Sequence, residues 1–484
     1  MAKIGKLGPL SGINPGPAST LPVMSPSYSR RWIALIGLLL AEAMNLLDAT
    51  IVQVAAPVIH TELPGPATEI QWFSAAYTLP LAMVLITGGR LGDLYGRKRI
   101  FTVGVAGFVL ASTICALSTS AGMLIATRSV QGVAAGLIIP QTFGLIRSMF
   151  DGPELPKALG CIGPVMGLAA VCGPIIGGLL THADLFGSSW RSVFLVNVPL
   201  GVVVLVLARL LREDRTPEPG RLDLPGAGLA MLGAALVIYP LIQGGWSFST
   251  WALLASGIVV LLVFGRQQRN HARRGRDSLI AVSLFASRGF VAALVCLTLF
   301  FAVLNGLTLI VVLQLQLGLH ADVLTTSLNL LPWSVGMGVS SMLAGRWLYP
   351  RYGANIVFAG LGLLLAGIVG AILAPAHFLW PPLGMAGLGV GLFTTPLFTV
   401  ALGNVRPHET GSAAGLLNAV QEFGATFGVA VLGTVFLDVS ARGAFVVAAG
   451  MVLLTGFGAA IMVHGARRRT GEAQSLAADS VFSD

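Results

Sequence analysis

Charged side chains are scarce in this sequence: Asp, Glu, Lys and Arg make up only 10% of its 484 residues, whereas soluble globular proteins have roughly 25%. Hydrophobic residues account for 55%. Such a chain cannot cover a water-facing surface, which excludes a soluble protein and indicates lipid as the solvent. Alternating segments of about ten residues, typical of membrane β-barrels, are also missing. We therefore expect an all-α membrane protein.

Cysteine and clustered metal ligands are equally scarce. The four cysteines all fall within apolar runs, without metal or redox spacing, and are expected to be small core residues. No His/Cys/Asp cluster of ligand spacing is present, so neither a cofactor nor a membrane-embedded glycosyl- or acyltransferase is expected. The net charge of +9 could suggest nucleic acid, but the basic residues are spread over many short loops. Membrane topology explains them better, and no nucleic-acid partner is predicted.

Apolar runs long enough to cross a bilayer recur along the chain. We predict fourteen spans, near residues 32–59, 71–90, 100–119, 122–146, 158–182, 190–210, 224–244, 251–265, 289–317, 323–345, 354–375, 379–402, 411–437 and 443–463. With the N-terminus inside, every Lys and Arg lies in an inside segment except Arg128, Arg191 and Arg442. The positive-inside rule requires this asymmetry, so both termini are predicted to be cytoplasmic.

The spans divide into two groups of six with a charged linker and two accessory spans between them. The predicted domains are a cytoplasmic tail at 1–30, a six-helix bundle at 31–211, the linker with its two accessory spans at 212–288, a second six-helix bundle at 289–466, and a disordered cytoplasmic tail at 467–484.

A polar stretch, residues 88–100 (GGRLGDLYGRKRI), separates the second and third spans. It resembles the loop between helices 2 and 3 of the major facilitator superfamily of transporters, whose pattern is G-x-L-x-D-x-x-G-R-K. The matching residues are Gly89, Leu91, Asp93, Gly96, Arg97 and Lys98. Residues 345–353 (GRWLYPRYG) form a degenerate repeat of this pattern, which is consistent with two related halves. The resemblance implies the superfamily's fold, in which two six-helix bundles rock around a midplane cavity.

The fifth span holds a Gly/Pro cluster that resembles the superfamily's antiporter motif, which is found in exporters rather than uptake symporters. Its residues are Gly160, Gly173, Pro174, Gly177 and Gly178, with Ala169 where the family usually has a further glycine. The cluster removes side chains and one backbone donor, so a helix of the other half can pack closely against it. Together with the loop motif, it is predicted to serve conformational change.

Ionisable residues lie inside several spans, where they are costly and usually functional. Residues 47–57 (LDATIVQVAAP) resemble a signature of the fourteen-helix drug:H+ antiporter branch, and Arg128 and Gln131 match its R-x-x-Q-G motif. Asp48 lies about 25 Å along its helix from Arg31, a depth that Arg128 shares, so the two are expected to interact. The apolar interior favours the neutral acid and the arginine favours the anion, which is the competition a proton-coupling carboxyl requires.

Two further acids fall within spans. Glu42 points about 120° away from Asp48 on an α-helix, and Glu422 stands where the family often has Gln. Proton coupling is assigned to Asp48, Arg128, Glu42 and Glu422. Substrate binding is assigned to Glu42, Asn45, Asp48, Gln131, Asn305, Gln314 and Glu422. The alternative for Glu42 and for Glu422 is a protonated, hydrogen-bonded structural group.

The motifs together imply an exporter in the bacterial inner membrane that uses inward proton flow to expel amphipathic, cationic drugs or antibiotics. Its partners would be a small-molecule substrate, protons and the lipid bilayer, and it would act as a monomer. The alternative is a dedicated exporter, or an uptake symporter, of a metabolite, lipid or siderophore on the same fold. The antiporter motif argues against uptake.

Overall fold

The computed structural model describes residues 30–184, 187–215, 223–245, 247–274, 279–375, 378–406 and 409–481, and the regular elements among them are all helices. Thirteen helical segments are long and apolar enough to cross a membrane. The longest, Val323–Leu373, has 51 residues and contains two helices, α12 (Val323–Leu343) and α14 (Ile356–Leu373). Both pack against α15 (Trp380–Leu402), so they lie beside the same neighbour rather than end to end.

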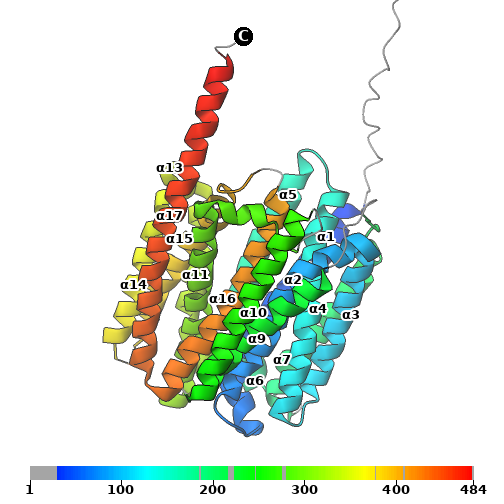
Figure 1. The fold of residues 1–484 in the computed structure, drawn as a ribbon. Helices are drawn as coiled ribbons and strands as arrows, with labels where there is room; N and C mark the ends of the chain where they lie inside the picture. Colours follow the sequence, from blue (N-terminus) through cyan, green and yellow to red (C-terminus); the bar gives the residue numbers. More distant parts are fainter. Residues whose placement is uncertain are drawn as a thin grey trace, which may run out of the picture.

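The first half of the bundle is built from helices that cover residues 31–208 (Figure 1). They are α1 (Arg31–Glu62), α2 (Glu69–Tyr95), α3 (Arg97–Ala116), α4 (Ala121–Met149), α5 (Glu154–Gly160), α6 (Ile162–His182), η2 (Ser189–Arg191), α7 (Ser192–Leu195) and α8 (Asn197–Ala208). Helices α2 and α3 both pack on α4, while α1 packs on α6 and α8. Figure 1 shows the starts of α1 and α3 at one end of the bundle, which we call the basic end.

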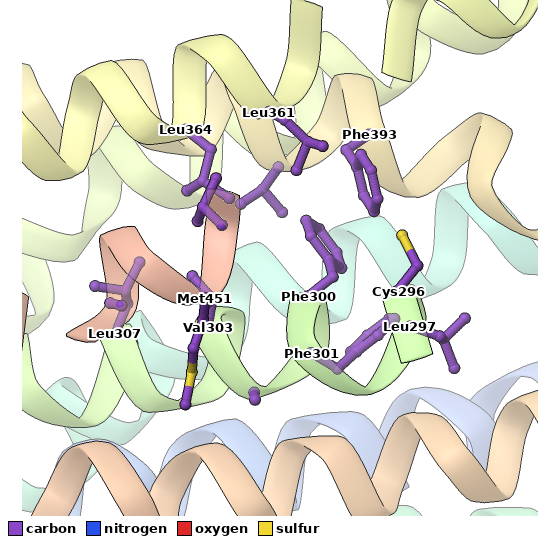
Figure 2. Packing of buried hydrophobic residues seen from close by; sticks show 14 of the residues in the cluster. Cys296, Leu297, Phe300, Phe301, Val303, Leu307, Leu361, Leu364, Phe393 and Met451 are labelled. Carbon is purple, nitrogen blue, oxygen red and sulfur yellow. The ribbon is translucent and has the colours of Figure 1, made fainter. Parts of the chain in front are cut away.

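The second half follows the same plan. Its elements are η3 (Val282–Ala286), α11 (Arg288–Leu313), the π-turn η4 (Gln314–Gly318), α12, the π-turn η5 (Ala344–Leu348), α13 (Tyr349–Tyr352), η6 (Gly353–Asn355), α14, α15, α16 (Thr410–Asp438) and α17 (Ala441–Val481). Helix α11 supplies the centre of its core (Figure 2), where the Phe300 ring lies 4.3 Å from that of Phe393. Burying each such side chain stabilises the fold by about 1.5–3 kcal/mol.

The accessory helices are α9 (Leu224–Gln243) and α10 (Phe248–Arg273). Helix α9 packs against α2 of the first half and α16 of the second, and α10 packs on α9. The prediction of a short span at 251–265 was wrong in length, since α10 has 26 residues. Arg and Gln are good helix formers, so the helix continues through the polar residues that follow the apolar run.

The polar stretch predicted as a loop is mostly helical. Helix α2 continues to Tyr95, and Gly96 alone separates it from α3, with φ of 101°. Gly353 has φ of 58° and starts the turn between α13 and α14. Only glycine adopts such positive φ at little cost, which explains why the degenerate repeat at 345–353 also has a glycine, Gly353, at its turn.

The C-terminal tail also differs from its prediction. Helix α17 continues to Val481 instead of giving way to disorder at residue 467, and Figure 1 shows it projecting beyond the bundle. Extending an existing helix costs far less than starting one, and the residues after 467 include many good helix formers. The predicted N-terminal tail at 1–30, apart from Arg30, lies outside the described residues, as do residues 216–222 of the predicted linker.

Candidate functional site

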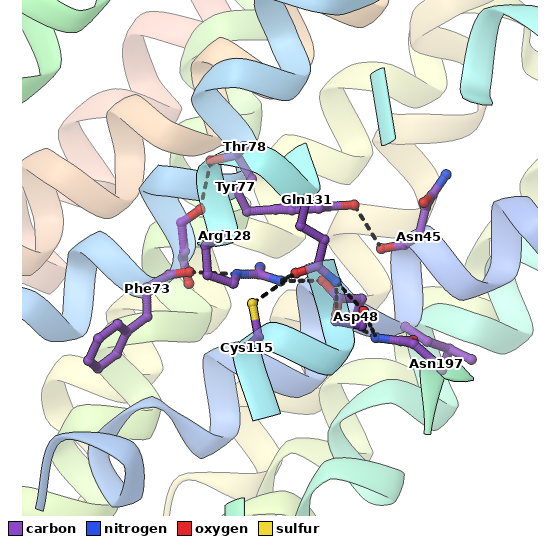
Figure 3. A network of polar contacts seen from close by, with 12 residues as sticks. Asn45, Asp48, Phe73, Tyr77, Thr78, Cys115, Arg128, Gln131 and Asn197 are labelled. Atoms are coloured by element: carbon purple, nitrogen blue, oxygen red, sulfur yellow. Dashed lines mark hydrogen bonds and ion pairs between the residues drawn. The ribbon is translucent and has the colours of Figure 1, made fainter. Parts of the chain in front are cut away.

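A buried ion pair joins α1 to α4. The Asp48 side chain is fully buried, and its Oδ2 pairs with Nη1 of Arg128 (Figure 3). Asp48 Oδ1 accepts hydrogen bonds from Gln131 Nε2 at 2.9 Å and from Asn197 Nδ2 at 2.7 Å. The predicted contact between Asp48 and Arg128 is therefore present, and both carboxylate oxygens are occupied by donors.

The Arg128 guanidinium has further partners in the same network. Its Nε donates to the Phe73 carbonyl oxygen at 3.1 Å, and Nη1 donates to Gln131 Oε1 at 2.8 Å. Its Cζ lies 4.3 Å from the centre of the Tyr77 ring, within cation–π range. A buried charge needs partners of this kind, because removing it from water costs several kcal/mol.

A second layer ties this network to α3 and α8. Ser112 Oγ accepts from Gln131 Nε2 at 2.7 Å and from Asn197 Nδ2 at 3.2 Å. The sequence-based prediction missed Ser112, Asn197 and Tyr77. For Asn197 the sequence contains a signal. The stretch 190–201 (WRSVFLVNVPLG), which runs from η2 into α8, resembles the W-R-x-x-F-x-x-N-x-P-x-G pattern of the drug:H+ antiporter branch, and Asn197 is the asparagine of that pattern. Side chains of α4 and α8 therefore donate directly to the Asp48 carboxylate of α1, and α2 and α3 supply partners to these donors.

A cavity of about 650 Å³ lies between the two halves. Glu42 and Asn45 of α1 face it from the first half, and Asn305 of α11 and Glu422 of α16 from the second. Its apolar lining includes Tyr77, Phe143, Met166, Phe301, Trp333 and Phe398. The cavity therefore combines acidic groups on opposite sides with aromatic and aliphatic walls.

Glu42 and Asn45 have unused polar atoms. Glu42 is 4% exposed and its Oε1 has no hydrogen-bond partner among the described residues; Asn45 is 5% exposed and neither amide atom has one. The two residues are three apart on α1, so they lie on one face of the helix. Buried polar groups are nearly always satisfied, so this pair indicates a place for a ligand or water. Glu422 differs, because its Oε1 accepts from Gln421 Nε2 at 3.0 Å.

The structure separates the predicted site residues into two sets. Asp48 and Gln131 do not line the cavity. The side chains of Arg128 and Tyr77 form this part of its wall instead. Gln131 is a member of the buried network and does not belong to the cavity wall, so its assignment to substrate binding stays a prediction. Gln314 also lies away from the cavity, in the π-turn η4.

The cavity is closed at the end of α1 opposite its start. Gln53 Nε2 donates to Asn305 Oδ1 at 3.2 Å, and Gln316 Nε2 donates to the Val54 carbonyl oxygen at 2.9 Å, so both bonds join α1 to the second half. Towards the basic end the lining extends to Phe143, near the end of α4, and Ala414, near the start of α16. The cavity is therefore directed towards the basic end.

The Gly/Pro cluster lies at the same closed end. A Cβ on Gly178 would collide with Ser327 of α12 in the other half, whereas one on Gly173 would collide with Thr50 of α1. The predicted close packing across the halves is thus confirmed at Gly178. Gly160 is not part of this packing, since a Cβ there would meet nothing within 4 Å. It belongs to the separate helix α5.

The loop motif forms a cluster of contacts at the basic end. Arg97 pairs with Asp93 at 2.9 Å and with Asp214 at 3.4 Å. Lys98 Nζ donates to the carbonyl oxygens of Arg209 and Leu211 at 3.1 and 2.6 Å. The sequence-based prediction did not foresee that the segment after α8 supplies Asp214 and the two carbonyl oxygens.

Comparison with known families gives one clear match. The family model described as Major Facilitator Superfamily matches residues 38–429. The chain is 42% identical over 434 residues to a probable actinorhodin transporter of Streptomyces coelicolor, covering 87% of this chain and 75% of that protein. It is 34% identical to a puromycin resistance protein of Streptomyces alboniger, covering 86% and 85% of the two chains. It is 33% identical to the multidrug resistance protein Stp of Mycobacterium tuberculosis, covering 81% and 73%.

The fold also matches a solved transporter. A crystal structure of the peptide transporter POT superposes with a TM-score of 0.65, covering 90% of this chain and 95% of that one at 18% identity. At this identity the likeness concerns the fold alone. It supports the arrangement of helices described above.

Proposed function

The chain belongs to the major facilitator superfamily, and we propose that it exports amphipathic, cationic drugs or antibiotics in exchange for protons. It is a multi-pass membrane transporter and not an enzyme. Relatives named for drug or antibiotic resistance and export support efflux by this chain. The proposed substrate class and the coupling ion depend on the cavity and on the buried network.

The cavity supports a cationic substrate. Glu42 approaches it from α1 and Glu422 from α16, and neither forms an ion pair among the described residues. Among the described lining residues Arg128 is the one arginine, and it is already paired with Asp48. The free acids would favour a positive group, and the aromatic walls would favour an apolar ring system beside it. The unpartnered atoms of Glu42 and Asn45 are the single observation on which this proposal chiefly depends.

The buried network supports proton coupling. In the present arrangement Asp48 accepts from two side-chain amides and pairs with Arg128, which suits a carboxylate anion. A proton on Asp48 would weaken the pair and release the guanidinium. Each charge entering down a 100 mV potential supplies about 2.3 kcal/mol, and each pH unit about 1.4 kcal/mol. Exchange of one proton for one monovalent cation gains only from the pH difference.

We also propose fourteen spans, both termini in the cytoplasm and a monomeric transporter. A single helix of 51 residues would measure about 75 Å, more than twice the thickness of a bilayer core. The division of Val323–Leu373 at Gly353 would give the fourteenth span. An even number places both ends on the side that carries most of the basic residues.

Transport in proteoliposomes tests the proposal. The purified chain would be reconstituted with a fluorescent lipophilic cation and a neutral analogue of similar size, and a pH gradient would be imposed with and without an uncoupler. We expect gradient-driven accumulation of the cation, abolished by the uncoupler and reduced at least tenfold by Glu42→Gln. Asp151→Asn, which changes an exposed acid, is the matched control and should transport normally. Transport of the cation by the Glu42→Gln variant at the rate of the unchanged protein would contradict the proposed site.

A dedicated exporter is the second candidate. Several relatives are named for a single compound or compound class, among them actinorhodin, puromycin and cephamycin. Substrate breadth distinguishes the two: a multidrug exporter accepts unrelated cations, whereas a dedicated exporter transports one chemical class. Competition among unrelated cations in the same proteoliposomes measures this directly.

A further inference from the structure

The outward face of the accessory helix α10 combines two kinds of side chain. Trp251, Ile258 and Leu262 are 56%, 50% and 68% exposed. One to three turns further along, Arg266, Arg269 and Arg273 are also exposed. At about 100° per residue, these six side chains fall within an arc of about 80°. The face therefore runs from an aromatic residue through an apolar stripe to three cations.

The opposite face of α10 is the one that packs. Its buried residues are Thr250, Gly257 and Gln268, and its helix neighbour in the bundle is α9. Gln268 Nε2 donates to Asp223 Oδ2 at 2.6 Å, so among the described residues Asp223 is engaged on the packed side. Among the described residues, the guanidinium groups of these three arginines have no hydrogen-bond or ion-pair partner.

A groove of about 590 Å³ lies among these arginines. Its lining residues all belong to α10, namely Leu261, Leu262, Gly265, Arg266, Arg269, Asn270 and Arg273. Gly265 contributes to the hollow, because no atom lies within 4 Å of the place a Cβ would occupy. The three arginines thus border this space from the side of α10, and Leu262 connects it to the apolar stripe.

We propose that this groove binds the headgroup of an anionic phospholipid, with the acyl chains along the apolar stripe. The distance from Trp251 to Arg266 is about 22 Å along the helix axis, comparable to most of a bilayer's hydrocarbon core. Guanidinium groups bind phosphate oxygens in pairs, and three of them within about 10 Å suit a negative headgroup at the interface. Topology alone accounts for basic residues on this side, but not for their alignment below an exposed apolar stripe.

Native mass spectrometry of the full chain in detergent tests this site, with phosphatidylglycerol and phosphatidylcholine of the same acyl chains as probes. We expect the unchanged protein to prefer phosphatidylglycerol about tenfold. R266Q/R269Q/R273Q should lose the preference. The control R99Q/R147Q/R288Q removes the same charge from exposed arginines at other helix ends, and it should keep the preference.

Three outcomes would overturn the assignment. The first is an undiminished preference in R266Q/R269Q/R273Q, and the second is an equal loss in both triple variants, which would indicate a general charge effect. The third is displacement of phosphatidylglycerol by equimolar glycerol phosphate, which would indicate a site for free phosphate compounds. R266K/R269K/R273K changes the same three residues but keeps their charge, and it should retain most of the preference. Comparing it with the Gln variant therefore separates the loss of charge from a folding defect.

Discussion

The buried pair of Asp48 and Arg128 allows a quantitative prediction. Asp48→Asn keeps the shape of the side chain but removes the charge, which leaves a guanidinium that is 1% exposed without its ion-pair partner. Breaking a buried pair in this way typically costs about 3–5 kcal/mol. Because an Asn oxygen in the place of Oδ1 still accepts from both amide donors, we expect a loss at the lower end of this range, about 3 kcal/mol. Arg128→Gln should cost a similar amount.

The double variant Asp48→Asn/Arg128→Gln provides the decisive comparison. It contains no uncompensated charge, so we expect it to be more stable than either single variant, with a coupling free energy of about 2–3 kcal/mol. Equilibrium unfolding in mixed detergent micelles measures all four proteins of the cycle. The same four proteins would be assayed for pH-driven efflux in proteoliposomes. We expect no proton-driven transport from any protein lacking Asp48, including the stabilised double variant.

An exposed pair gives the matched control for this cycle. Asp93 and Arg97 are about a quarter exposed, so Asp93→Asn and Arg97→Gln should couple by no more than about 1 kcal/mol. Additive losses at Asp48 and Arg128 would refute the reasoning from the buried pair. Proton-driven transport by the Asp48→Asn protein would instead refute its role in coupling while leaving its structural role intact.

Three further predictions concern the closed end, a helix cap and the linker. Gly178→Val should fold but lose at least tenfold in transport rate, because its side chain prevents α6 from approaching α12, whereas Gly160→Val should transport normally. The hydrogen bond from Thr325 is the main reason why the pKa of Asp322 lies below its usual value; Asp322→Ala should therefore lower the melting temperature at pH 7, and the difference should fade as pH falls through the depressed pKa. Asp214→Asn removes an ion pair that holds the segment after α8, so it should speed tryptic cleavage of this segment, measured by gel electrophoresis. An unchanged cleavage rate would mean that the backbone contacts alone hold the segment.

Motif and composition were enough to predict the helices and the central ion pair. Hydrophobic length locates spans because lipid offers no partner for free backbone groups, and the depths of Asp48 and Arg128 along their helices predicted their contact. Helix ends were less predictable. Helix α10 extends to Arg273 through residues rich in Arg and Gln, which are good helix formers, whereas α2 extends to Tyr95 through Gly92 and Asp93, which are not.

The polar partners were harder to predict than the charged residues. Gln131 was assigned to the substrate site, yet its amide lies between Asp48 and Ser112, because the direction of a side chain depends on the packing of α3 and α4. Asp214 lies 117 positions from Arg97 in the sequence, and no local pattern links the two. Such long-range pairs depend on how whole helices cross.

The two acids of α1 differ in what they can reach. Glu42 faces the cavity, whereas Asp48, about 9 Å further along the helix, is sealed from it by Arg128 and Tyr77. In this arrangement a substrate entering from the basic end can meet Glu42 without meeting the carboxylate of Asp48. A proton can reach Asp48 only if the guanidinium moves or the closed end opens. The proposed exchange would require this separation, because a proton site open to both sides of the membrane would dissipate the gradient proposed to drive export.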